Sequence, residues 1–180
     1  TKELACRKKL LILRIYLIKM ETLKNNLLDG LKLKKSLNRI VDVVNFEGPL
    51  LTLYKSVSNR HLYLLDWVDR DSIFNRWLVY RCDPVLLNNF IKGEISHKEL
   101  FLSNENYCYV VDINKSYVWN NLQKINKIDL SSNYIPVEDA FFEEVDCPNF
   151  SKLKRFLYEV KVSQKPNNSV AINYFSEIGI

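Results

Sequence analysis

The chain of 180 residues is 47% hydrophobic and 12% aromatic, and it carries 26 Lys or Arg residues against 21 Asp or Glu residues. This length suits one domain with a real core and is too short for two domains of ordinary size, while the hydrophobic content excludes a disordered chain. Six basic residues and one acidic residue fall within residues 1–20, so residues 21–180 have no net charge. We therefore expect a basic leader at 1–20 and a single neutral domain at 21–180.

The basic leader contains an apolar run from Leu10 to Ile18. Arg14 interrupts this run and no small-residue cleavage site follows it, which argues against a secretory signal; the run is also far too short to span a bilayer. Two alternatives remain for the leader. Either Met20 is the natural start and the leader is foreign to the protein, or the leader is an amphipathic basic helix that contacts an anionic membrane or a partner.

The next segment changes from helical to strand periodicity. Apolar residues recur every three or four positions from residue 21 to residue 44, which predicts a helix with a weak point at Gly30. After the turn signal Glu47-Gly48-Pro49, short polar connections separate three runs rich in strand-forming residues. These runs, at residues 50–57, 61–68 and 74–82, predict an antiparallel three-stranded meander.

Two short helices are predicted after the meander. Asp83 as N-cap and Pro84 at the first helical position begin one helix, which Gly93 ends. Ser96 and Glu99 form a capping box for the second helix. His97, in the first turn of that second helix, is expected to be exposed to solvent.

Two further hairpins are expected in the rest of the chain. Residues 106–113 and 116–123 form one. Residues 156–162 and 169–175 form the other, unless a helix extends through 152–154 into this region. The fold class is α+β: an N-terminal helix, an antiparallel β-meander, a short helical pair and further β-hairpins.

Large aromatic and basic side chains concentrate in the meander. Because side chains alternate along a strand, Trp77 and Val79 share one face, and Arg76, Leu78 and Tyr80 share the other. These side chains are explained either as core aromatics with arginines at the margins or as an interaction surface, since Tyr, Trp and Arg are enriched at interface hot spots. The candidates for the interaction surface are Arg60, Trp67, Arg76, Trp77, Tyr80 and Arg81.

Signs of catalytic chemistry are sparse. Asp66, Asp69 and Asp71 surround a predicted hairpin turn and are candidates for binding a divalent metal, although Asp is common in such turns for ordinary reasons. The four glycines are isolated, which excludes the usual nucleotide-binding loops. The four cysteines are widely separated and only two histidines are present, so we expect reduced, buried cysteines and no cofactor.

Four stretches carry a resemblance to a known family: "FEGPLLTLY", "LYLLDWVD", "NRWLVYRCDPVLLNNFIKGEISHKEL" and "NYIPVEDAFFEE". In order and spacing they resemble an uncharacterised bacterial domain family of unknown function, over roughly residues 45–144. The resemblance implies a bacterial, cytoplasmic protein encoded among mobile-element or phage-conflict genes. The family has no established catalytic residues, so no residue role is carried over.

These observations favour a non-enzymatic protein-interaction or accessory domain of the antitoxin or immunity type, with another protein as its partner. An acidic segment at residues 138–146 can accelerate association with a basic partner. One alternative is a nucleic-acid-associated factor in which aromatic rings of the sheet stack on the bases and arginines neutralise the phosphates. The other alternative is a divalent-metal-dependent hydrolase.

Overall fold

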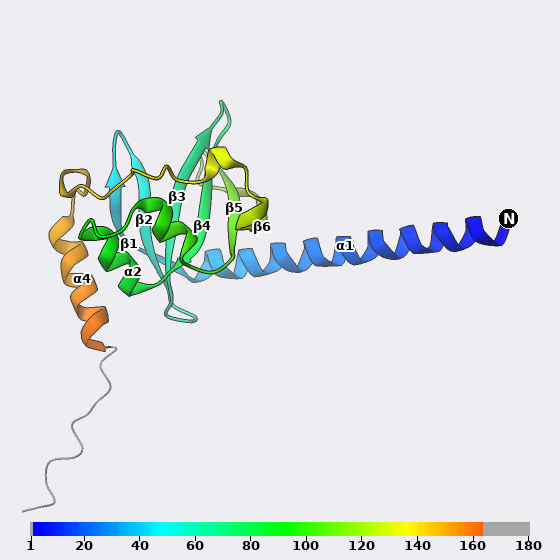
Figure 1. Ribbon diagram of the computed structural model, residues 1–180, viewed down its shortest axis with the longest axis horizontal. Coiled ribbons are helices and arrows are strands. Elements are labelled where there is room, and N and C mark those ends of the chain that lie inside the picture. Colours follow the sequence, from blue (N-terminus) through cyan, green and yellow to red (C-terminus); the bar gives the residue numbers. More distant parts are fainter. Residues whose placement is uncertain (1, 164–180) are drawn as a thin grey trace, which may run out of the picture.

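The computed structural model describes residues 2–163. One antiparallel sheet and the helices around it make up this part of the chain, so the predicted α+β class is confirmed (Figure 1). In chain order the main elements are α1 (Lys2–Ser36), β1 (Leu37–Asn45), β2 (Pro49–Ser56), β3 (Leu62–Arg70), β4 (Phe74–Cys82), α2 (Pro84–Ile91), α3 (His97–Leu102), β5 (Tyr107–Asn114), β6 (Trp119–Asn126) and α4 (Phe150–Ser163). Three single-turn helices, η1 (Lys127–Asp129), η2 (Ser132–Tyr134) and η3 (Glu144–Asp146), precede α4.

The six strands pair in chain order, from β1 to β6. The predicted meander is confirmed as β2, β3 and β4, in which Leu62 lies opposite Cys82 and Trp67 opposite Trp77. The helices α2 and α3 intervene between β4 and β5, yet β5 returns beside β4 with Val79 opposite Tyr109. The hairpin predicted after the two helices is confirmed as β5 and β6.

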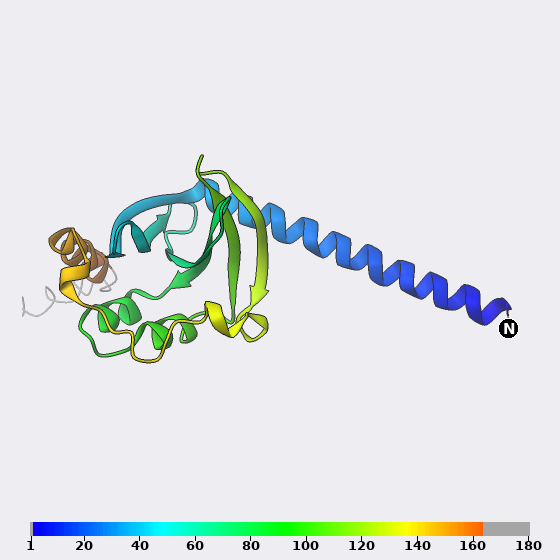
Figure 2. The ribbon, with the colours of Figure 1, turned by 90° about the horizontal axis from the view of Figure 1, so that it is seen from above.

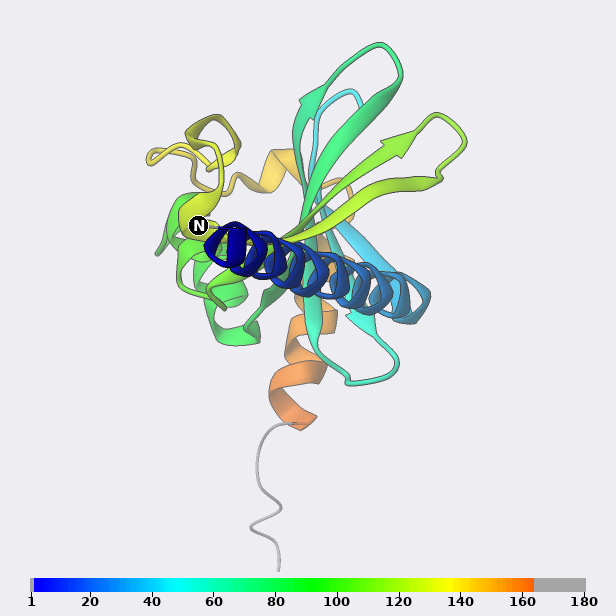
Figure 3. The ribbon, with the colours of Figure 1, turned by 90° about the vertical axis from the view of Figure 1, so that its right-hand side faces the viewer.

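The sheet has two differently covered faces (Figure 2). It curves around α2 and α3, and we call this side the inner face; its core includes Leu64, Leu78, Phe90, Phe101 and Leu153. On the opposite side, which we call the outer face, a smaller buried cluster consists of Leu65, Val79, Tyr109, Val111 and Leu122. Only the C-terminal end of α1 covers part of the outer face, and the rest of α1 projects away from the sheet (Figures 1 and 3).

The position predicted for the C-terminal end of the first helix is wrong. Residues 37–44 belong to β1 rather than to a helix, and α1 passes through Gly30 without a break. Both periods fit this stretch, because Ile40, Val41 and Val44 are spaced for a helix while Val41 and Val43 are spaced for a strand. Pairing with β2 and the high strand preference of β-branched residues decide for the strand.

The strand predicted at residues 156–162 is also wrong, because this segment lies in α4. Leu153 and Leu157 are buried one helical turn apart, with Phe150 and Phe156 packed beside them on the inner-face core. That spacing buries one side of a helix. The segment therefore follows the alternative given above, a helix that extends through residues 152–154 into this region. The partner strand predicted at 169–175 lies outside the described residues.

Both predicted helix starts are confirmed. The Asp83 carboxylate accepts a hydrogen bond from the Val85 amide over 2.7 Å, with Pro84 at the first position of α2. Ser96 and Glu99 form a complete capping box at α3. Across residues 2–163, no helix has a segment long and apolar enough to cross a membrane.

Candidate functional site

The outer face carries a row of aromatic and basic side chains. Strand register places Arg39, Tyr54, Tyr63 and Arg81 side by side across β1, β2, β3 and β4. Both tyrosines are half-buried, so each packs one part of its ring on the outer-face core and leaves another part open. Side chains that alternate along a strand lie on one face, which is why four separate strands can build this row.

A second row of aromatics lies nearer the β3–β4 hairpin. Trp67 and Trp77 are direct cross-strand neighbours, and the Trp67 indole donates to the Asn75 side chain over 3.3 Å. Trp67 is 36% exposed, whereas Trp77 packs against the outer-face core. Cross-strand aromatic pairs stabilise a sheet and at the same time leave flat apolar surface for a partner.

Both arginines of the first row already have carboxylate partners. The Arg39 guanidinium lies 2.6 Å from Asp42, which also accepts from the Thr52 hydroxyl, and these bonds outweigh burial and lower the pKa of Asp42. Arg81 lies 2.8 Å from Glu105. Burial raises the pKa of Glu105, but the hydrogen bond from Arg81 outweighs burial and the net shift is downward. The outer-face arginines therefore present little uncompensated positive charge.

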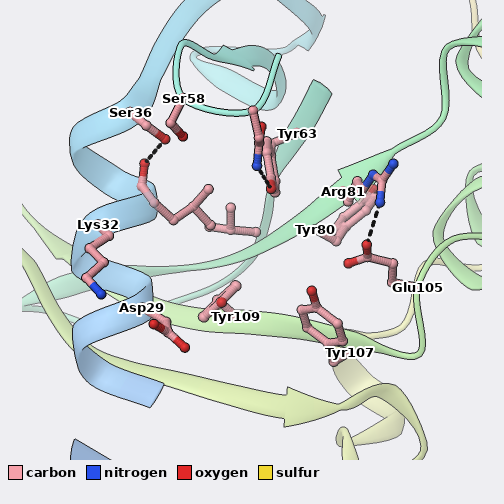
Figure 4. Close-up of a pocket in the computed structure, with 13 residues that line it drawn as sticks. Asp29, Lys32, Ser36, Ser58, Tyr63, Tyr80, Arg81, Glu105, Tyr107 and Tyr109 are labelled. Atoms are coloured by element: carbon pink, nitrogen blue, oxygen red, sulfur yellow. Dashed lines mark hydrogen bonds and ion pairs between the residues drawn. The ribbon is translucent and has the colours of Figure 1, made fainter. Parts of the chain in front are cut away.

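A pocket of ≈ 230 Å³ opens where α1 meets the outer face (Figure 4). Asp29 and Lys32 of α1 line one side, and the Arg81–Glu105 pair lies across from them. Its remaining polar walls include Ser58, Asn59, Tyr63, Tyr107 and Tyr109. Pockets for drug-sized ligands occupy about 300–1,000 Å³, so this one is suited to a single polar side chain or a very small molecule.

The predicted interaction residues divide among three places. Trp67, Trp77 and Arg81 share the outer face. Arg60 is exposed and lines a separate pocket of ≈ 520 Å³ beside the β2–β3 hairpin and α4. Arg76 and Tyr80 lie on the inner face; Tyr80 is 1% exposed and Arg76 is held by Asp112.

The Arg76–Asp112 pair is a structural link on the inner face. Nε and Nη2 of Arg76 donate to the two carboxylate oxygens over 2.8 and 3.0 Å, and Asn121 donates to the same carboxylate. Burial raises the pKa of Asp112, but the bonds from Arg76 and Asn121 outweigh it and lower the pKa. The third guanidinium nitrogen, Nη1, donates to the Tyr134 hydroxyl over 2.7 Å, which ties β4 to η2.

His97 is not solvent-exposed as predicted, because it belongs to a buried polar cluster on the inner face. Its Nε2 lies 3.0 Å from Asp66 and 3.3 Å from the Tyr80 hydroxyl, and that hydroxyl also bonds to Asp66. Burial lowers the pKa of His97, but the charge of Asp66 and the hydrogen bond to it outweigh burial, so the pKa is raised. Asp66 and Tyr80 are almost wholly buried and His97 is half-buried, so the cluster satisfies polar groups of the inner-face core.

The three metal candidates have separate roles. Asp66 belongs to the buried cluster, while Asp69 accepts from the Arg70 amide and from Tyr134. Asp71 accepts from the backbone amides that follow it and closes the β3–β4 hairpin, which is the ordinary role of Asp in a turn. Among the described residues, no three His, Cys, Asp or Glu side chains are placed to hold a metal ion.

The described cysteines lack nucleophilic character. Cys82, Cys108 and Cys147 are buried and unpaired by disulfides, as predicted. Burial raises the pKa of each of these thiols, and that of Cys108 reaches about 11. The thiolate is the reactive form of cysteine, so these side chains behave as small apolar groups.

Sequence reasoning missed two parts of this arrangement. Arg39 lies within the helix predicted over residues 21–44, so the sequence does not predict its place beside Tyr54. Lys127 is 6% exposed, and its ammonium donates to the Phe101 carbonyl and lies 4.4 Å from the Phe101 ring centroid. A single lysine in a polar stretch has no sequence signal for burial.

No protein-family model, curated protein or solved structure matches this chain.

Proposed function

We propose that this chain is a non-enzymatic interaction protein that binds another protein through the outer face of its sheet. The observation that carries the proposal is the row of half-exposed tyrosines between two arginines, with Trp67 and Trp77 beside it. Such side chains supply large contact area at a low entropic cost, and Tyr, Trp and Arg dominate interface hot spots.

The pairing of the two arginines in this row favours a protein over a nucleic acid as the partner. A phosphate backbone is bound mainly by uncompensated Lys and Arg side chains. Here Arg39 and Arg81 are each neutralised by a carboxylate within 2.8 Å. A phosphate would have to displace Asp42 or Glu105, whereas a protein partner can pack on the aromatic rings and leave the ion pairs in place.

An affinity purification from extract of the source organism tests the proposal with the full chain. Wild type is compared with Trp67→Ala and Tyr54→Ala on the outer face, and with Tyr158→Ala as a control. Tyr158 is an exposed tyrosine of α4, an element packed on the inner-face core. Each variant is first checked for an unchanged unfolding midpoint.

We expect one stoichiometric, nuclease-resistant protein that copurifies with wild type and Tyr158→Ala and is lost with both outer-face variants. Recovery of nucleic acid alone would support the nucleic-acid alternative instead. A partner retained by both outer-face variants would exclude the outer face as its binding surface.

A further inference from the structure

The middle of α1 lies away from the rest of the described chain. From Arg14 to Asn25 every residue of the helix is exposed. Only the C-terminal end rests on the sheet, where Gly30 is buried against Leu122 and Lys34 lies over the Trp119 ring. Figure 3, which looks along α1, shows the helix projecting from the sheet toward the viewer.

A stripe of exposed apolar side chains runs along α1. At 3.6 residues per turn these side chains occupy an arc of about 160° of the helix surface. Each is at least 40% exposed, and we call the set the apolar stripe: Ile12, Tyr16, Leu17, Met20, Leu23, Leu27, Leu28 and Leu31. The opposite side carries the polar residues Arg14, Thr22 and Asn25, and two further exposed apolar residues, Ile15 and Ile18, lie among them. A contiguous exposed apolar surface of this kind marks an interaction site.

The docking of α1 on the sheet leaves the apolar stripe uncovered. Gly30 and Leu33 face the sheet; Gly30 lies in line with Ile12 at one edge of the stripe, and Leu33 lies beyond that edge. Leu27 and Leu31 sit beside these docked residues and are still 44% and 40% exposed. The stripe is therefore available along its whole length.

The charge of α1 is strongly positive. The helix contains ten Lys or Arg residues and three acidic residues. In a parallel pair of two copies joined along Tyr16, Met20, Leu23 and Leu27, the flanking Lys19 of one copy would face Lys24 of the other. This like-charge contact opposes self-association, whereas an anionic apolar surface complements both the stripe and the charge.

We propose that α1 lies along the surface of an anionic membrane, with the apolar stripe at the boundary between lipid headgroups and acyl chains. A basic amphipathic helix binds in this way through its buried apolar area and its attraction to acidic lipids. Lys24 lies within the arc of the stripe, and Lys19 lies at its edge; their long side chains can extend to the lipid phosphates. This surface is separate from the outer face of the sheet.

Vesicle co-sedimentation of the full chain tests this proposal. Vesicles of phosphatidylcholine alone are compared with vesicles that contain about 30% phosphatidylserine. Each basic residue near an anionic surface strengthens binding roughly fivefold, so we expect at least about tenfold tighter binding to the anionic vesicles. Binding should weaken as the salt concentration rises from about 0.1 M to about 0.5 M.

Two charge-matched double variants separate the stripe from simple electrostatics. L23E/L27E and T22E/N25E both add two negative charges to the exposed helix, but only L23E/L27E places them in the apolar stripe. All four wild-type side chains are exposed, so neither variant disturbs the core. We expect L23E/L27E to bind anionic vesicles at least about tenfold more weakly than T22E/N25E. Circular dichroism confirms that both variants keep the helix.

Several results would overturn the proposal. They are the absence of vesicle binding, equal binding to neutral and anionic vesicles, and equal loss in the two double variants. Sedimentation equilibrium measures whether a second copy of the chain binds the stripe instead. A dimer that forms without vesicle binding and is abolished by L23E/L27E would assign the stripe to a second copy of the chain.

Discussion

Gly30 is the position at which the docking of α1 on the sheet can be measured, because its replacement by alanine has two opposing effects. In a helix interior alanine is about 1 kcal/mol more favourable than glycine. A Cβ at this position would lie 2.2 Å from Cδ2 and 2.7 Å from Cγ of Leu122, which is buried in the outer-face core. Overpacking of this kind costs roughly 1–3 kcal/mol. We therefore expect Gly30→Ala to lower the free energy of unfolding by about 1 kcal/mol.

Urea unfolding of the full chain, followed by tryptophan fluorescence, measures this change. Leu122→Ala by itself should cost about 2–5 kcal/mol, because it leaves a cavity in the cluster. In the double variant the clash is absent and only the gain in helix propensity remains, so its loss should be smaller than the sum of the single losses by the relieved clash, about 2 kcal/mol. Asn25→Ala, on the free part of α1, serves as the control and should change stability by no more than a few tenths of a kcal/mol. If Gly30→Ala stabilised the protein by about 1 kcal/mol without coupling to Leu122, α1 would not rest on β6 as described.

Three further predictions concern buried polar groups and thiols. Replacing Arg76 by Met leaves the buried Asp112 carboxylate without its charge partner. Breaking a buried ion pair in this way costs about 3–5 kcal/mol, and because Arg76 is partly exposed we expect the free energy of unfolding at neutral pH to fall by roughly 3 kcal/mol. A loss within the error of urea unfolding would contradict this role. The raised pKa of His97 means that its pairing with Asp66 stabilises the fold fully below about pH 6.5 and progressively less as the pH rises through its folded-state pKa. Unfolding measured from about pH 6 to about pH 9 should show that decline in wild type and a flatter profile in His97→Gln, and identical profiles would refute the assignment. Alkylation of Cys108 by iodoacetamide, followed by mass spectrometry at about pH 8, should be at least about tenfold slower in the folded protein than in urea, and equal rates would show that the thiol is accessible.

Local signals in the sequence were reliable where neighbouring residues alone supply the physical interaction. The cap of α2 needs only a carboxylate two residues before an unpaired amide, and Asp83 and Val85 provide both. The capping box of Ser96 and Glu99 is equally local. Alternation along β4 correctly separated Trp77 from Tyr80 for the same reason, because the direction of a side chain follows from its own strand.

Predictions from local sequence patterns were wrong at β1 and α4, where contacts with distant elements decide the structure. The apolar residues of 37–44 satisfy both helical and strand spacing, and only hydrogen bonding to β2 selects the strand. The residues of 156–162 alternate as a strand would, but burial of Leu153 and Leu157 on the inner-face core selects the helix. In both cases a distant element supplies the deciding interaction.

The sequence by itself determined the α+β class, the central meander, both helix caps and the concentration of positive charge in the leading segment, because these depend on composition and on contacts between near neighbours. Tertiary structure alone decided which aromatic side chains share the outer face, and that Glu105 neutralises Arg81 and Asp112 holds Arg76. It also decided that the side of α1 with Gly30 and Leu33 faces the sheet, which leaves the centre of the apolar stripe exposed. Strand register and helix docking join residues far apart in the chain, and no local pattern specifies those partners.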